Sequence, residues 1–94
     1  MRHMILVKLK EDAPDAARFA REIAPLFLRA LEIDGVQRVK VTPACITAAN
    51  RSDVLIEMEL TQEGLRRFDA SEIHAEWKRR FGARLACKAI FDGE

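Results

Sequence analysis

Residues 3–9, His-Met-Ile-Leu-Val-Lys-Leu, decide the fold. In an extended chain, alternation places His3, Ile5 and Val7 on one face and Met4, Leu6 and Lys8 on the other. The strand is therefore apolar on both faces. A chain of 94 residues buries only about 60 to 65% of the surface that its unfolded form exposes, so cover from a second chain matters. We expect a strand whose two faces both need cover.

A helical pattern follows this strand. We expect Asp12 to be the N-cap, with Ala13, Pro14 and Asp15 in the first turn, where a proline lacks only a donor that is unpaired anyway. Pro25 interrupts the stripe, and an interior proline costs about 3 kcal/mol, so we expect a kink or a break there. The apolar stripe consists of Phe19, Ile23, Leu26, Phe27, Ala30 and Leu31. Gly35 is expected to end the segment.

Two further strands come next. Residues 36–46 alternate in the manner of a strand with one wet face, and Pro43 indicates an end or a bulge near a sheet edge. Residues 53–60 form the third strand. Its two faces carry Val54, Ile56, Met58 and Leu60 on one side and Leu55, Glu57 and Glu59 on the other.

Two helices and a last strand complete the chain. Thr61 and Ser71 are suitable N-caps, each followed by an acidic residue within the first turn, and Gly82 ends the pair. Residues 84–92 alternate again and predict the last strand. Its two faces carry Leu85, Cys87, Ala89 and Phe91 on one side and Ala86, Lys88 and Ile90 on the other.

The order β-α-β-β-α-β predicts a ferredoxin-like α+β fold, a four-stranded antiparallel sheet with helices on one face. The second face is then open, and it is too apolar to stay wet. We expect a second copy to cover it with its own sheet, giving a homodimeric α/β barrel. The open face is expected to hold Met4, Leu6, Leu55, Ala86 and Ile90, with Lys8, Lys88, Glu57 and Glu59 at its rim. With no repeat or linker, residues 1–94 are one domain.

The composition of the chain argues against several classes of function. There are 16 Lys and Arg against 15 Asp and Glu, a formal charge of +1, which disfavours binding to nucleic acid. Cys45 and Cys87 have no disulfide or metal spacing, and Lys8 and Lys10 break the first apolar run well short of a membrane span. We expect a cytoplasmic protein with no metal, no nucleotide and no other cofactor.

The chain resembles the stress-responsive dimeric α/β barrel proteins, the Dabb family, over nearly its whole length. The resemblance rests on residues 2–10, the turn at 33–36, the strand 53–60 and residues 89–92 (Ala-Ile-Phe-Asp), and it implies a homodimer with facing sheets. Where the family often has His-Pro-x-His, this chain has Ser71-Glu72-Ile73-His74, which keeps the second histidine.

One plant member of the family, olivetolic acid cyclase, is distantly similar to this chain. The resemblance implies a role for His74, because the matching histidine of that enzyme acts in an aldol cyclisation together with a tyrosine six positions earlier. Phe68 occupies that position in this chain, and another pocket histidine falls on Val54. His3 is carried over as a pocket residue. The hydroxyl that the tyrosine supplies in the cyclase has no counterpart at position 68 of this chain.

His74 and His3 are the candidate site residues. Both imidazoles are expected to face one cavity between sheet and helices, where a histidine near neutral pH can take a proton from a substrate. Further pocket residues are expected among the apolar side chains, although such stripes are more often plain core. These are Phe68, Trp77, Phe27, Val54 and Ile56.

Several functions fit this pattern. The first is binding of a small apolar or aromatic compound. The second is a cofactor-free polyketide cyclase-like enzyme, isomerase or lyase with His74 as general base. The third is a haem-degrading or cofactor-free monooxygenase using His74, Trp77 and Asn50, and the fourth is a purely structural dimer within a larger assembly.

Overall fold

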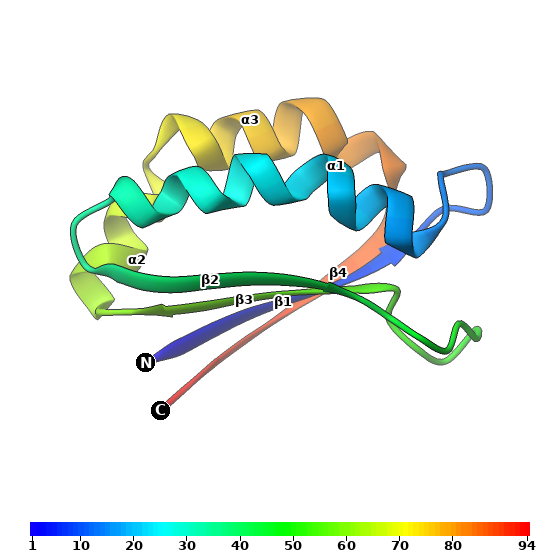
Figure 1. Ribbon diagram of the computed structural model, residues 1–94, viewed down its shortest axis with the longest axis horizontal. Helices are drawn as coiled ribbons and strands as arrows, with labels where there is room; N and C mark the ends of the chain where they lie inside the picture. Colours follow the sequence, from blue (N-terminus) through cyan, green and yellow to red (C-terminus); the bar gives the residue numbers. More distant parts are fainter.

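The computed structural model describes residues 1–94 as a single sheet with all helices on one face (Figure 1). Neighbouring strands are antiparallel and lie in the order β2-β3-β1-β4. The predicted ferredoxin-like α+β fold is thus confirmed. In chain order the elements are β1 (Arg2–Leu9), α1 (Ala16–Leu28), the 3-10 helix η1 (Arg29–Glu32), β2 (Val36–Pro43), β3 (Val54–Leu60), α2 (Gln62–Asp69), α3 (Glu72–Phe81), the 3-10 helix η2 (Gly82–Arg84) and β4 (Leu85–Gly93).

Helix α1 differs from its prediction at two points. Its N-cap is Asp15 rather than Asp12, and the Asp15 side chain accepts a hydrogen bond from the Arg18 amide at 2.8 Å. Pro14 accounts for the loss of Asp12 as the cap, because Ala13 would then be the first helical residue and a residue before proline avoids the helical conformation. The expected break at Pro25 is also absent: α1 continues to Leu28, with Pro25 on the exposed face.

The core lies between the sheet and the helices. The strand residues facing this side include Ile5, Val7, Ile56 and Met58, each at most 3% exposed. They meet a layer of large side chains from all three helices, and every member is buried. This layer consists of Phe19, Ile23, Leu26, Phe27, Phe68, Ile73, Trp77 and Phe81.

Helices α2 and α3 begin where the sequence predicts. The Thr61 hydroxyl accepts from the Gly64 amide at 2.9 Å, and the Ser71 hydroxyl accepts from the His74 amide at 3.3 Å. Each cap satisfies one of the backbone donors that a helix start leaves free. The short link between the two helices holds them under one end of α1, which places Phe68 and His74 close together.

The set of β4 residues on the open face is the opposite of the predicted one. It pairs Phe91 with Met4, Ala89 with Leu6 and Cys87 with Lys8, so these β4 residues share the open face. Ile90 and Lys88 pair with Ile5 and Val7 and therefore lie on the helix side. The register shifts at Lys8/Leu9, and β4 has apolar residues at both parities, so its own alternation cannot select the face.

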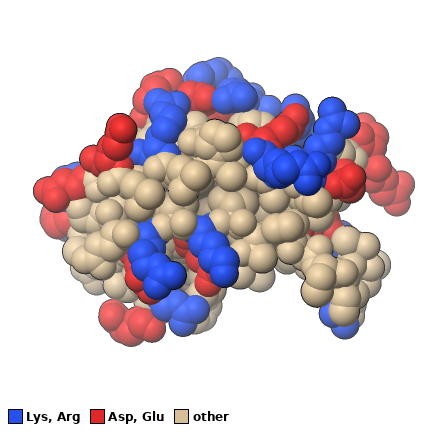
Figure 2. All heavy atoms as spheres, viewed as in Figure 1, with Lys and Arg blue, Asp and Glu red and all other residues tan.

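The open face has an apolar part and a charged part. Met4, Leu6 and Leu55 lie beside the apolar residues of β4, and Phe91 is 59% exposed. On the β2 side, Arg38 pairs in register with Glu59, and Lys40 lies opposite Glu57. Figure 2 shows charged side chains of both signs over the helices and again beneath the sheet.

Candidate functional site

His3 lies at the start of β1 on the helix side, only 4% exposed. It sits in register with Asp92 of β4, and its Nδ1 is 2.5 Å from an Asp92 carboxylate oxygen. A carboxylate oxygen only accepts, so the hydrogen of this bond is on Nδ1, and Nε2 has no partner within the chain. Thr42 Oγ1 is the one fully buried side-chain polar atom that has no hydrogen-bond partner. The Nε2 atom of His3 also has no partner, so it is not fully buried and keeps some contact with solvent.

Phe68, from the last turn of α2, separates His3 from His74. Its fully buried ring lies edge-on to both imidazoles, with centroid distances of 6.4 Å to His3 and 5.4 Å to His74. The structure therefore brings together three of the residues singled out in the sequence. A ligand that contacts both imidazoles has to displace the Phe68 ring, because this ring is fully buried between them.

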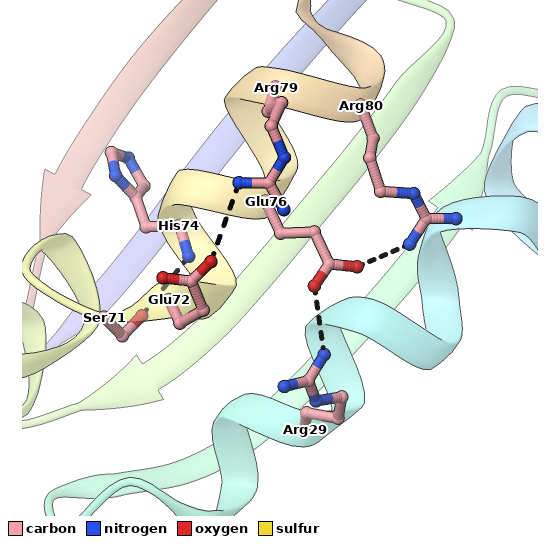
Figure 3. Close-up of polar contacts among 7 residues, drawn as sticks. All are labelled: Arg29, Ser71, Glu72, His74, Glu76, Arg79 and Arg80. Carbon is pink, nitrogen blue, oxygen red and sulfur yellow. Dashed lines mark hydrogen bonds and ion pairs between the residues drawn. The ribbon is translucent and has the colours of Figure 1, made fainter.

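His74 stands in the first turn of α3 and is partly buried. Its ring points toward β4, away from the ion pairs of this helix (Figure 3). Burial lowers the pKa of His74, and Lys78, Lys88 and His3 lower it further against the opposing charge of Asp69. The ring forms no hydrogen bond within the chain. It is therefore a neutral imidazole near pH 7, free to accept a proton or a hydrogen bond.

Ion pairs fix α3 from its other side. Glu76 accepts from Arg80 at 2.5 Å and from Arg29 of η1 at 3.3 Å, and its side chain is only 18% exposed (Figure 3). The Arg80 hydrogen bond, followed by that from Arg29, lowers the pKa of Glu76. This carboxylate ties α3 to the end of α1, and so helps to fix the direction in which His74 points.

The other predicted pocket residues lie in the core. Trp77 packs edge-on against Phe27 at a centroid distance of 5.0 Å, and Phe27 lies 6.2 Å from Phe68. Val54 and Ile56 are on the helix side of β3, at most 2% exposed. These four residues pack in the core next to the site, and their role in lining a pocket stays a prediction.

Asn50 does not join His74 and Trp77, as the monooxygenase hypothesis requires. It is exposed in the β2–β3 loop, between Ala48 and Arg51, whose carbonyls both accept from the Lys8 ammonium. Lys8 lies five positions from His3 along β1, about 17 Å in an extended strand. The loop and the first turn of α3 are at opposite ends of the sheet (Figure 1).

Asp92 is the site residue that sequence reasoning did not single out. It lies 89 positions from His3, so only the register of β4 against β1 brings the two side chains together. The one available signal was an acidic residue in a strand pattern of apolar neighbours. No group of three or more His, Cys, Asp and Glu side chains is arranged to hold a metal ion. None of the helices combines the length and apolar character needed to cross a bilayer.

A separate hollow of about 330 Å³ lies on the open sheet face. It is lined by charged side chains of both signs: Arg2, Arg38, Lys40, Glu57 and Glu59, together with Met58. Arg2 and Glu57 approach to 3.9 Å, as do Arg38 and Glu59. This mixture of charges suits pairing with a matching surface better than it suits a small apolar compound.

The fold occurs in solved structures of other proteins. A dimeric ferredoxin-like protein of unknown function from Thermobifida fusca has a TM-score of 0.78 at 18% identity, covering 96% of this chain and 85% of that chain. A Dabb family protein with a ferredoxin-like fold from Mesorhizobium loti has a TM-score of 0.73 at 16% identity, covering 99% of this chain and 93% of that chain. A dimeric ferredoxin-like protein from Bacteroides fragilis has a TM-score of 0.71 at 16% identity with the same coverage.

Comparison by sequence gives less. No protein-family model matches the chain, and no curated protein matches it. The similarity to olivetolic acid cyclase therefore stays a prediction. At these low identities the solved structures establish the architecture: the chain has the ferredoxin-like α+β fold that the Dabb family protein and the two dimeric proteins share.

Proposed function

We propose that the chain forms a homodimer through its open sheet face and that each copy binds a small apolar or aromatic compound beside His3 and His74. The observation that carries the binding site is the position of the two imidazoles on either side of Phe68, each with a ring nitrogen that no protein group occupies. Aromatic contact with one or two polar groups is the usual composition of a small-molecule site.

The dimer is supported by the unsatisfied surface of the sheet. Met4, Leu6 and Leu55 lie beside a Phe91 side chain that is 59% exposed, and an apolar area of this kind is rarely left in water. Two solved proteins of the same fold are described as dimeric. The charged part of the face, with basic β2 beside acidic β3, is self-complementary in sign, which suits a two-fold interface.

Sedimentation equilibrium at micromolar concentration tests the dimer. Leu6→Lys puts a charge in the middle of the open face and is expected to give a folded monomer. Leu28→Lys is the matched control, because Leu28 is also an exposed leucine but lies on α1. A wild-type monomer, or a Leu6→Lys variant that stays dimeric, would contradict the proposal.

Thermal-shift screening with aromatic acids and polyketide-like compounds tests the binding site. A ligand at 100 times its dissociation constant stabilises the folded state by about 2.7 kcal/mol, enough to raise Tm by about 11 to 22 °C in a domain of this size. His3→Ala and His74→Ala should reduce the shift, and Asn50→Ala at the far end of the sheet should not. If no compound in the set stabilises the protein, the proposed binding site is wrong.

One observation favours a second function, a cofactor-free reaction next to a carbonyl group. Burial lowers the pKa of His74, so its imidazole is present as a neutral base at pH 7. His3, oriented by Asp92, lies on the other side of Phe68, and its Nε2 is left for a hydrogen bond with a polar group of the substrate. An activity that survives His74→Ala unchanged would rule out this mechanism.

A further inference from the structure

The loop between β2 and β3 has the wrong composition for a solvated loop. The loop spans residues 44–53, and its first seven residues, Ala-Cys-Ile-Thr-Ala-Ala-Asn, carry no charge in a chain that is 33% charged, while Arg51 and Asp53 lie at its end. The loop is nevertheless exposed, and Ile46, its one large apolar side chain, is 55% exposed and outside the core. Surface loops are normally polar, whereas the centre of an interface is depleted of charge.

The loop is held at its middle and at its C-terminal end. The Lys8 ammonium donates to the carbonyls of Ala48 at 2.7 Å and Arg51 at 3.0 Å. Asp53 is 8% exposed, its amide donates to the Val7 carbonyl at 2.7 Å, and its carboxylate accepts from the backbone of β1. Such a loop presents its apolar side chain in one arrangement, which lowers the ordering cost of docking.

The loop also lies on the side where a second copy is expected. Lys8, which holds it, shares the open face with Met4 and Leu6. Figure 1 shows the loop running past the end of the sheet and bending away from the helices. In Figure 2 the same projection is mostly free of charged side chains, with Lys or Arg atoms at its lower end. It therefore extends the apolar open face beyond the strands.

We propose that the β2–β3 loop is a docking arm, with Ile46 and its uncharged neighbours packing against the second copy when the two open sheet faces meet. The inference rests on the proposed homodimer and adds a contact outside the two sheets. The occupant is a second copy because the arm continues the open face that is proposed to pair.

The two native cysteines give a direct test. Both are exposed in the single chain, Cys45 in the arm and Cys87 on the open face of β4. Cys87→Ser leaves Cys45 as the only thiol, and Cys45→Ser leaves Cys87. Ala17→Cys in a background lacking both is the control, because Ala17 is exposed on α1. Reaction with 5,5′-dithiobis(2-nitrobenzoate) is followed at micromolar protein concentration.

The expected result is protection of both native thiols, with Cys45 reacting at least about tenfold more slowly than the control thiol and regaining reactivity on dilution. If Cys87 is protected and Cys45 reacts like the control, the docking arm is wrong and the dimer stands. If both react like the control, both proposals are wrong.

A second measurement does not depend on thiols. Ile46→Asp removes the large apolar side chain of the arm without disturbing the folded chain and is expected to raise the dimer dissociation constant at least about tenfold. Leu28→Asp is the matched control, since Leu28 is 49% exposed against 55% for Ile46 but lies on the helix side. Equal dissociation constants for the two variants would overturn the inference.

Discussion

A glycine contact beneath the candidate site gives a sharp test of the structure. Gly64, in the first turn of α2, lies against Gly35, which has a φ of 96°. A Cβ added at Gly64 would lie 2.7 Å from both the carbonyl carbon and the carbonyl oxygen of Gly35. Gly35 cannot easily yield, because its carbonyl accepts from the Thr61 amide at 2.9 Å. Gly64→Ala therefore has to push α2 away from the start of β2.

Two effects of opposite sign decide the magnitude. Alanine is favoured over glycine inside a helix by about 1 kcal/mol, whereas overpacking against a fixed neighbour costs about 1 to 3 kcal/mol. The obstacle at Gly64 is backbone, so the cost belongs in the upper part of that range. We expect a net destabilisation of about 1 to 2 kcal/mol and a fall in Tm of about 4 to 8 °C for each kcal/mol.

Gly82→Ala is the internal control. Gly82 has a helical φ of −54° and ψ of −36°, and no atom lies within 4 Å of its added Cβ. Alanine there restricts only the unfolded chain and should stabilise by about 0.4 to 1 kcal/mol. Circular dichroism melts and urea titrations of the two variants should thus move in opposite directions. A Gly64→Ala protein as stable as wild type would refute the packing of α2, and with it the placement of Phe68.

Four further perturbations test the remaining parts of the argument. Asp53→Ala removes a buried acceptor of the β1 backbone and should lower the free energy of unfolding in urea by about 1 to 3 kcal/mol, so an unchanged midpoint would contradict its role. Burial lowers the pKa of His74 below its ordinary value of 6.5, so the unfolded chain takes up the proton first and stability falls as the pH drops below about 6.5. An NMR titration of the imidazole must show this lowered pKa, and His74→Ala must remove that part of the pH dependence. The Arg80 hydrogen bond lowers the pKa of Glu76 below 4.5, so its contribution to stability is present above that pH and is lost as the pH falls through the folded-state value. The Glu76→Gln variant should have a lower free energy of unfolding at neutral pH, and this free energy should fall less steeply with decreasing pH than in wild type. If the two curves of unfolding free energy against pH are parallel, the ion pair contributes nothing. Monomeric Leu6→Lys should bind any ligand found in the screen more weakly than wild type in a calorimetric titration, and equal affinity would separate the binding site from the dimer.

Local signals in the sequence predicted the elements well. The caps Thr61 and Ser71 are read correctly because an N-cap depends only on residues a few positions away. The same locality explains the error at α1, where Asp12 and Asp15 are both good caps and only the restraint imposed by Pro14 separates them. The two apolar faces of β1 could also be predicted, since the residues of both faces lie in one short stretch of sequence.

Features that depend on how the strands pair could not be predicted from the sequence. The face that β4 presents is set by its register with β1 and by the shift at Lys8/Leu9, and its own residues are compatible with either face. The contact between His3 and Asp92 follows from that register alone. His74 and Phe68 were singled out through the resemblance to the Dabb family, whereas Asp92 was missed because its contact with His3 appears only once the strands are aligned.

Strand β1 and its neighbour β4 connect the two proposals. On the helix side they carry His3 and Asp92, which form the anchored half of the candidate site. On the open side they carry Leu6, Ala89 and Phe91, which belong to the proposed interface. β4 is an edge strand whose residues 86–92 are all exposed, so in a single chain only its pairing with β1 restrains the Asp92 carboxylate. Covering its open face with a partner sheet would restrict β4 and thereby the orientation of His3, so binding and dimerisation should stabilise each other.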